Sequence, residues 1–379
     1  MIRTLAPLLL FVPFVARGGP TLTVEPPPRT TVAPVQRAQV ELVFVIDTTG
    51  SMSGLIEGAK ETIWSVVNDF ASQQPRPDVR VGIVAFRDRG DQYVTSALPL
   101  TADLDAVYAR LVSLRAQGGN DTPESVVKGL EVAVGEQPWT RQGRVFRSIF
   151  LVGDAPDKHY SDEPSAGEVV SRARVAGIYV NAIQCGSITG TASEFRAIAK
   201  RGEGTFRAVA QDGAVERLAT PQDAQLDALR QQLQRTALPW GSSAEQAETS
   251  QKLQMYDHAS LGTNASRMSV LSKSGGKIVT GEGRGDLIDE LLEGRVVLSR
   301  IPEEQLPQVL RRLPVAERQA EVDRRIAERK RLQAEIAGVV EDRDAWVTDA
   351  RRKATAAPAY DREVVESSLE RMTELGYIR

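Results

Sequence analysis

An apolar run that ends in a carboxylate and closely spaced hydroxyls constrains this chain more than any other feature. Residues 42–46 (Leu-Val-Phe-Val-Ile) lead directly into Asp47, Thr49 and Ser51. A short, continuous apolar run bounded by turn residues predicts a strand that is buried on both faces, as in parallel sheets. In open α/β sheets, ligands bind beyond the carboxyl ends of the strands. These three side chains are therefore candidate ligands, and their oxygen chemistry favours Mg²⁺, Mn²⁺ or Ca²⁺ over zinc.

A helix cap without a metal is the competing interpretation of this turn, because Asp and Ser are favoured N-cap residues. Two later segments support the metal. A glycine-rich loop at 118–125 contains Asp121 and Thr122 and opens a predicted helix, and a second apolar run at 148–153 ends at Asp154. The candidate ligands thus come from three strand or helix ends.

These separated motifs resemble those of the von Willebrand factor A domain family over about residues 39–211. The resemblance implies a metal-ion-dependent adhesion site, and the matching residues are Asp47, Thr49, Ser51, Thr122 and Asp154. Many members with the same Asp-Thr-Thr-Gly-Ser-Met motif carry Gly-Gly-x-Asp-x-Pro-Glu in the second loop. Asp121 is therefore a candidate to replace or assist Thr122.

Helical and strand patterns alternate between the motifs. The predicted helices lie at 55–70, 104–114, 124–134, 169–176 and 194–200, and the further predicted strands at 79–86, 93–100, 177–185 and 205–209. Strands that alternate with helices need crossover connections and so favour a parallel sheet. The predicted fold class is α/β, with a doubly wound, mostly parallel sheet flanked by helices and followed by a mainly α-helical C-terminal region.

Composition limits the broad class of the protein. The chain has 379 residues, of which 41% are hydrophobic, enough for one large core and a second module. A formal net charge of −3 gives no argument for binding nucleic acid or anionic lipid. The single cysteine, Cys185, excludes an internal disulfide, and its position in an apolar strand favours a packing thiol over a nucleophile.

The N-terminal segment reads as a targeting signal. Residues 5–16 are apolar after Arg3 and match the length of a signal-peptide core, which is short for a bilayer span. We therefore predict a signal peptide, or alternatively an N-terminal membrane anchor, at 1–18, and a Pro-rich linker at 19–38. The predicted location is the periplasm or cell envelope of a bacterium.

The predicted domain organisation continues with a von Willebrand factor A domain at 39–215, a mixed helix and loop region at 216–314, and a charged helical arm at 315–379. Helices are expected at 223–233, 286–292, 302–313, 315–353 and 362–375. The long helix at 315–353 carries a narrow apolar stripe. That stripe either packs back on the chain, or mediates self-association or the binding of a partner.

The predicted function is a metal-dependent protein-binding module. In the family that this chain resembles, an Asp or Glu of a partner protein completes the coordination of the cation. The alternatives are a Mg²⁺- or Mn²⁺-dependent hydrolase of phosphate esters and a structural envelope protein with a non-functional metal site. We find no nucleophile paired with a base and predict no enzyme. Of the two histidines, His159 and His258, the first is interpreted as a surface loop residue near the metal face.

The charged segment 87–91 (Arg-Asp-Arg-Gly-Asp) follows the predicted strand at 79–86. It either borders the metal and shapes what approaches it, or is a solvated turn with weak local ion pairs.

Overall fold

The computed structural model describes residues 38–71, 73, 75, 77–119, 122–209, 219–273, 285–353 and 360–378. The predicted signal peptide or anchor and nearly all of the predicted linker lie outside these residues. So do Asp121 and most of the glycine-rich segment at 272–285. Within the described residues, no helix is both long enough and apolar enough to cross a bilayer.

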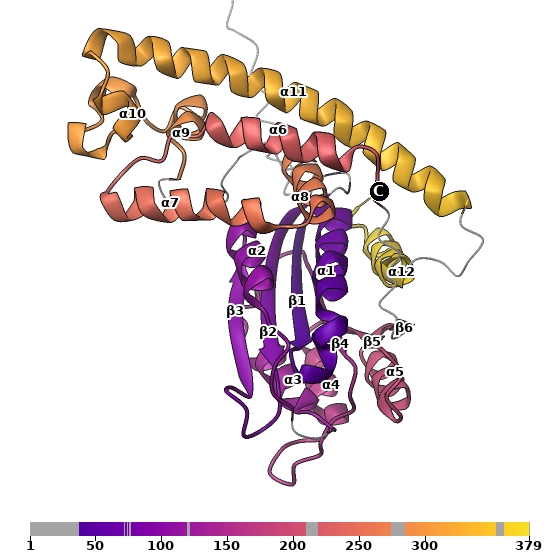
Figure 1. Ribbon diagram of the computed structural model, residues 1–379. Helices are drawn as coiled ribbons and strands as arrows, with labels where there is room; N and C mark the ends of the chain where they lie inside the picture. The colour runs from indigo at the N-terminus through magenta and orange to yellow at the C-terminus, as the bar shows by residue number, and fades with distance from the viewer. Residues whose placement is uncertain are drawn as a thin grey trace, which may run out of the picture. The chain divides into compact units, whose positions relative to one another are not determined.

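The described part of the chain contains one six-stranded sheet in the order β3-β2-β1-β4-β5-β6 (Figure 1). All neighbouring strands pair in parallel except β2 and β3, which are antiparallel. The strands are β1 (Gln39–Asp47), β2 (Asp78–Phe86), β3 (Thr95–Thr101), β4 (Val145–Gly153), β5 (Ile178–Cys185) and β6 (Glu203–Val209). The predicted doubly wound, mostly parallel sheet is confirmed.

The central strand β1 explains why its sequence is continuously apolar. It pairs with β2 on one side and β4 on the other, and all its residues after Gln39 are buried. Val40, Leu42, Phe44 and Ile46 belong to the core on one face of the sheet. Val43 and Val45 belong to the core on the opposite face.

Helices cover both faces of the sheet. The first face packs against α1 (Ile56–Ala71) and α2 (Leu104–Ser113), with Trp64 and Tyr108 fully buried. The helices on the second face are α3 (Val126–Gly135), α4 (Ala166–Val175) and α5 (Thr191–Arg201). All five agree with predicted helices to within a few residues.

The C-terminal region is mainly helical, as predicted. Its helices are α6 (Asp223–Arg235), α7 (Ser243–Met255), α8 (Leu261–Lys273), α9 (Leu287–Leu292), α10 (Gln308–Arg311) and α11 (Val315–Lys353). The sequence did not predict α7 and α8, because α7 buries little apolar surface and α8 buries the polar Asn264 and Arg267. The predicted helix at 302–313 is reduced to short turns and α10.

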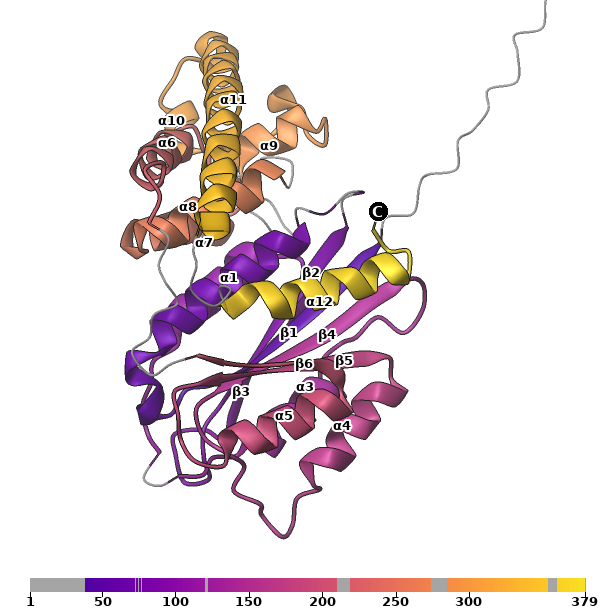
Figure 2. The same cartoon turned by 90° about the vertical axis from the view of Figure 1, so that its right-hand side faces the viewer.

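The long helix α11 packs back on the chain. Its apolar residues Leu332, Ile336, Val339 and Val340 lie in one core cluster with residues of α6 and α8. Figures 1 and 2 both show α6 alongside α11. The first of the two interpretations of the apolar stripe therefore describes the observed packing.

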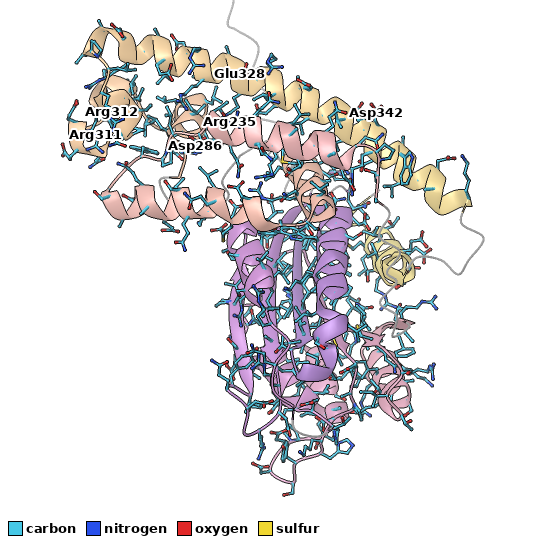
Figure 3. All side chains as sticks on the ribbon, viewed as in Figure 1. Arg235, Asp286, Arg311, Arg312, Glu328 and Asp342 are labelled. Carbon is cyan, nitrogen blue, oxygen red and sulfur yellow. The ribbon has the colours of Figure 1, made fainter. Side chains whose placement is uncertain are left out.

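One buried arginine fixes α11 to its neighbours. Arg329 is fully buried and pairs with Asp286 and Asp289 at the start of α9, with Nη1 2.7 Å from Oδ1 of Asp289. Its Nε donates a 3.0 Å hydrogen bond to the hydroxyl of Thr236 at the end of α6. Figure 3 labels Asp286 in this region. Three helical segments are joined by a single guanidinium.

The last helix, α12 (Tyr360–Glu374), has different neighbours from α11. Val365, Met372 and Ile378 join the core on the α1 face of the sheet. Ser367 and Thr205 of β6 bring their hydroxyl oxygens to 2.6 Å, and Figure 2 shows α12 beside α1. The predicted arm at 315–379 thus contains two helices, one in the helical region and one on the sheet.

Candidate metal centre

The carboxylate of Asp47 is held at the carboxyl end of β1. Its side chain is fully buried. Oδ1 accepts hydrogen bonds from the backbone N of Thr49 at 2.8 Å and from the Thr49 hydroxyl at 2.6 Å. The chain turns sharply here because the short 3-10 helix Gly50–Gly54 follows at once. Oδ1 is therefore fixed, and Oδ2 remains for another partner.

Ser51 connects this turn to the end of β4. Its Oγ lies 3.1 Å from Oγ1 of Thr49 and donates a 3.0 Å hydrogen bond to Oδ1 of Asp154. The residue is exposed, so the network reaches the surface. Asp47, Thr49, Ser51 and Asp154, four of the six candidate ligands, thus lie in one hydrogen-bonded group.

The second-loop candidates have a different outcome. Thr122 is exposed, and Asp121 lies outside the described residues. The structure instead brings Glu124 to the centre, with only 2% of its surface exposed. Sequence reasoning missed Glu124, which it treated as the first residue of a helix. The Pro-Glu at the end of the second-loop motif was the available signal.

Two glycines allow the second loop to approach the first motif. A Cβ on Gly119 would lie 3.0 Å from Oε1 of Glu124 and 3.1 Å from Cβ of Thr49. Gly118 and Gly119 have φ values of +78° and +74°, a conformation that favours glycine. The carbonyl of Gly118 accepts a 2.9 Å hydrogen bond from the N of Gly50. Glycine is therefore required both by conformation and by space.

The charges of the centre are poorly compensated. Burial, together with the charge of Asp154, raises the pKa of Asp47 to about 7. Burial and then the charges of Asp47 and Asp88 raise the pKa of Glu124 to about 8. Burial also raises the pKa of Asp154. Burial is the largest cause for each carboxyl, and neighbouring carboxylate charges add to it for Asp47 and Glu124.

Two buried oxygens at the centre have no hydrogen-bond partner among the described residues: Oδ2 of Asp47 and Oε2 of Glu124. Buried polar atoms are normally satisfied, so these two indicate a missing partner. A divalent cation fits, because it would neutralise the carboxylates and accept carboxylate and hydroxyl oxygens as ligands.

The charged segment 87–91 supports the centre through its buried residues, whereas Arg89 and Gly90 at its tip are exposed. Arg87 and Asp88 are buried. Nε of Arg87 donates a 3.1 Å hydrogen bond to the carbonyl of Thr48. Both carboxylate oxygens of Asp91 accept a 3.1 Å hydrogen bond from the backbone N of Gly119. The segment therefore holds both loops of the candidate site, and its role in shaping what approaches the metal stays a prediction.

Asp88 ties three segments together behind Glu124. Its carboxylate accepts hydrogen bonds from Ser125 Oγ at 2.9 Å, Lys158 Nζ at 2.9 Å and Tyr160 OH at 2.8 Å. Arg89 lies over the ring of Tyr160, with Cζ 3.8 Å from the ring centroid. The loop after β2 is thereby attached to the start of α3 and to the loop after β4.

The nucleophile candidates are poorly suited to catalysis. Cys185 is buried at the end of β5, and burial raises the pKa of its thiol to about 12. A protonated thiol is a weak nucleophile at neutral pH. The His159 side chain is 73% exposed and contacts Asp157. Both observations agree with the predictions of a packing thiol and a surface histidine.

Comparison with known proteins identifies the sheet-containing part. Residues 41–218 match the family profile of the von Willebrand factor A domain. This part of the chain is a von Willebrand factor A domain. The match confirms the resemblance that the sequence predicted over about 39–211. The von Willebrand factor A domain-containing protein 7 of Rattus norvegicus is 33% identical over 117 residues, which cover 31% of this chain and 12% of that protein. The chain therefore spans only a small part of this curated relative.

Two solved structures show a low overall similarity to this chain. BatB from Bacteroides thetaiotaomicron is 18% identical, with a TM-score of 0.34 and coverage of 58% of this chain and 100% of that chain. Proximal thread matrix protein 1 from the mussel byssus, with a zinc-occupied MIDAS motif, is 19% identical. Its TM-score is 0.38, and the match covers 47% of this chain and 43% of that chain.

Proposed function

We propose that this von Willebrand factor A domain is a protein-binding module that depends on a divalent cation. Asp47, Thr49, Ser51 and Asp154 would hold the ion, which is Mg²⁺, Mn²⁺ or Ca²⁺. The observation that carries the proposal is the pair of buried carboxylate oxygens without partners, on Asp47 and on Glu124. Domains of this family generally act as interaction modules.

Glu124 is the strongest second-loop ligand in this proposal. It is buried beside Thr49, whereas Thr122 is exposed. Thr122 and Asp121 then have outer roles, as ligands to bound water or as contacts to a partner. The pKa of about 8 for Glu124 reflects burial and neighbouring negative charges. A cation at this place would offset those charges and favour the ionised carboxylate, which supports the assignment.

A partner carboxylate completes the proposed coordination. Hard divalent cations take about six or more oxygen ligands, and Mg²⁺ usually keeps several waters. The exposed Ser51 marks the side from which water or a partner can reach the ion. An Asp or Glu of a partner protein would replace one water, so binding would require both the cation and the acidic side chain.

The test uses a displayed library of peptides with a central Asp or Glu, together with a matched library that carries Asn or Gln at that position. The full chain is panned in Mg²⁺, Mn²⁺ or Ca²⁺, or in EDTA. We expect enrichment of acidic peptides only with a cation, and loss of enrichment in Asp47→Ala. If acidic peptides are enriched in EDTA, or by Asp47→Ala with a cation, as strongly as by the native chain with a cation, metal-dependent binding is refuted.

Two other functions predict different outcomes. A hydrolase would turn over p-nitrophenyl phosphate in Mg²⁺ or Mn²⁺, with loss of turnover in Asp47→Ala. A structural protein with a non-functional site would show no change in melting temperature with any cation. The proposed module predicts a cation-dependent melting temperature and no turnover.

The proposed location is the bacterial cell envelope. It rests on residues 1–18, either as a cleaved signal peptide or as a membrane tether. An alkaline phosphatase fusion after residue 38 should be active in the periplasm of a bacterial host, and deletion of residues 1–18 should abolish that activity. Activity that survives the deletion would exclude export by this segment.

A further inference from the structure

Three side chains with metal-binding atoms lie together outside the proposed centre. Asp157 and His159 belong to the loop after β4, and Glu194 lies in the first turn of α5. One ligand atom from each lies within 4.8 Å of the other two. Within the ranges that the structure describes, this is the one group of His, Cys, Asp or Glu side chains with that spacing. The proposed binding function does not use these residues.

Asp157 is held in a fixed orientation. Its side chain is 3% exposed, and Oδ1 accepts a 2.8 Å hydrogen bond from the backbone N of Val127 at the start of α3. Oδ2 accepts a 2.8 Å hydrogen bond from the backbone N of His159 and is hydrogen-bonded at 2.8 Å to Nδ1 of the same residue. Bonds of about 2.0–2.1 Å at tetrahedral angles place two Zn²⁺ ligands about 3.3 Å apart. The Asp157–His159 pair is closer than this by about 0.5 Å, so a small opening of the pair would admit the ion.

Glu194 closes the group from α5. Its two carboxylate oxygens accept hydrogen bonds of 3.2 and 3.3 Å from the backbone N of Asp157. This contact holds the carboxylate next to Asp157, and one of its oxygens lies within 4.8 Å of a ligand atom of Asp157 and of His159. The imidazole of His159 is mostly exposed, so water can supply further ligands from the solvent side. Two carboxylates and one imidazole make an open site with three protein ligands.

We propose that Asp157, His159 and Glu194 form a second cation site, which takes Zn²⁺ or a similar transition-metal ion. Imidazole nitrogen suits Zn²⁺, Cu²⁺ and Ni²⁺, whereas Mg²⁺ and Ca²⁺ prefer oxygen ligands throughout. The second site therefore differs in ion preference from the all-oxygen centre at Asp47.

The backbone connects the second site to the first. The N of Glu124 donates a 2.9 Å hydrogen bond to the carbonyl of Pro156, and the N of Lys158 donates one of 2.9 Å to the carbonyl of Glu124. An ion that fixes Asp157 also fixes the segment that positions Glu124. Occupancy of either site should then raise the cation affinity of the other, and by the same factor in both directions.

The experiment is Zn²⁺ titration calorimetry of the EDTA-stripped full chain in saturating Mg²⁺. We expect one Zn²⁺ site per chain. His159→Ala and Glu194→Gln should each weaken it by at least about tenfold, the cost typical of disturbing a metal shell. Glu194→Gln retains an acceptor for the N of Asp157. The other histidine supplies the matched control, because His258→Gln should leave Zn²⁺ affinity unchanged.

The outcomes separate this proposal from the proposed function. Asp47→Ala should retain the Zn²⁺ site, so a failure of the first centre would not remove the second. Circular dichroism verifies that each variant is folded. An absence of Zn²⁺ binding in the native chain would overturn the proposal. Equal Zn²⁺ affinity in the native chain and both ligand variants would also overturn it.

Discussion

The hydroxyl of Ser51 donates a 3.0 Å hydrogen bond to Oδ1 of Asp154, although the two residues are 103 positions apart. This bond joins the loop after β1 to the end of β4. Thr49 extends the network to Asp47, whose Oδ1 accepts the threonine hydroxyl at 2.6 Å. Hydroxyls thus link two buried carboxyls with raised pKa values. The domain holds these acidic groups together in advance of any cation.

The first prediction concerns the pH dependence of the metal-free protein. Asp47 and Glu124 have pKa values near 7 and 8 when folded, above their ordinary values of 3.8 and 4.5. Their contribution to stability is fully present below pH 4 and is lost as the pH rises through 7 to 8, since the folded state binds protons more tightly. In EDTA, we expect the melting temperature to fall from pH 5 to pH 8.

Asp47→Asn isolates this effect, because the amide oxygen can still accept both hydrogen bonds from Thr49. Its melting temperature in EDTA at pH 8 should exceed that of the native chain by about 2–4 °C for each kcal/mol of relieved repulsion. Mg²⁺ should flatten the native pH profile and leave that of the variant unchanged. Identical native profiles with EDTA and with Mg²⁺ would argue against an occupied site.

The second prediction separates the second-loop candidates. Glu124→Gln should weaken Mn²⁺ binding by about 10–100-fold, as loss of a ligand or its support does. Above pH 8, the same variant should melt higher in EDTA, since a neutral amide removes a buried charge next to Asp47. Thr122→Ala, at an exposed position, should change Mn²⁺ affinity much less. Titration calorimetry measures the Mn²⁺ affinity of both variants, and a thermal melt measures the stability in EDTA. The reverse order of effects would assign the ligand to Thr122.

The third prediction concerns the buried Arg329. Arg329→Met leaves Asp286 and Asp289 without their cation, and breaking a buried pair typically costs about 3–5 kcal/mol. Arg331→Met is the control on the same helix. The Arg331 side chain is 53% exposed in its pairs with Glu328 and Glu335, so its loss should cost far less than that of Arg329. Urea unfolding measures the two free energies. Equal costs would contradict the special role of Arg329.

The sequence was sufficient to predict the sheet because local pattern and tertiary environment agree there. β1 is apolar at successive positions because helices cover both faces of the sheet. The antiparallel β3 lies at the edge of the sheet and pairs only with β2. The loops that carry Asp47 and Asp154 follow strands with the same apolar pattern. Their convergence follows from the parallel order of β1 and β4.

The remaining features depend on contacts between distant segments. Glu124 reaches the centre because the glycine loop folds onto Thr49, and the one local signal for it was the Pro-Glu that ends the second-loop motif. Arg267 of α8 is buried through its 2.7 Å ion pair with Asp105 of α2, so hydrophobic periodicity could not reveal the helix. The sequence did contain a signal for the start of α7, because Ser242 and Glu245 have the spacing of the capping box that the structure shows. The prediction did not use that signal.

The fourth prediction tests the glycine loop. Gly119→Ala introduces a Cβ about 3.0 Å from Oε1 of Glu124 and 3.1 Å from Cβ of Thr49, at a φ of +74°. Gly90→Ala is the control for conformation alone, because Gly90 has a φ of +92° and nothing within 4 Å of the added Cβ. Each substitution should cost about 1–2 kcal/mol from the left-handed backbone.

Gly119→Ala should cost more and should also weaken Mn²⁺ binding, since the methyl group displaces Glu124 or Thr49. Urea unfolding and Mn²⁺ titration separate the two effects. If both variants bind Mn²⁺ as tightly as the native chain, the close approach of this loop is not needed for the cation site.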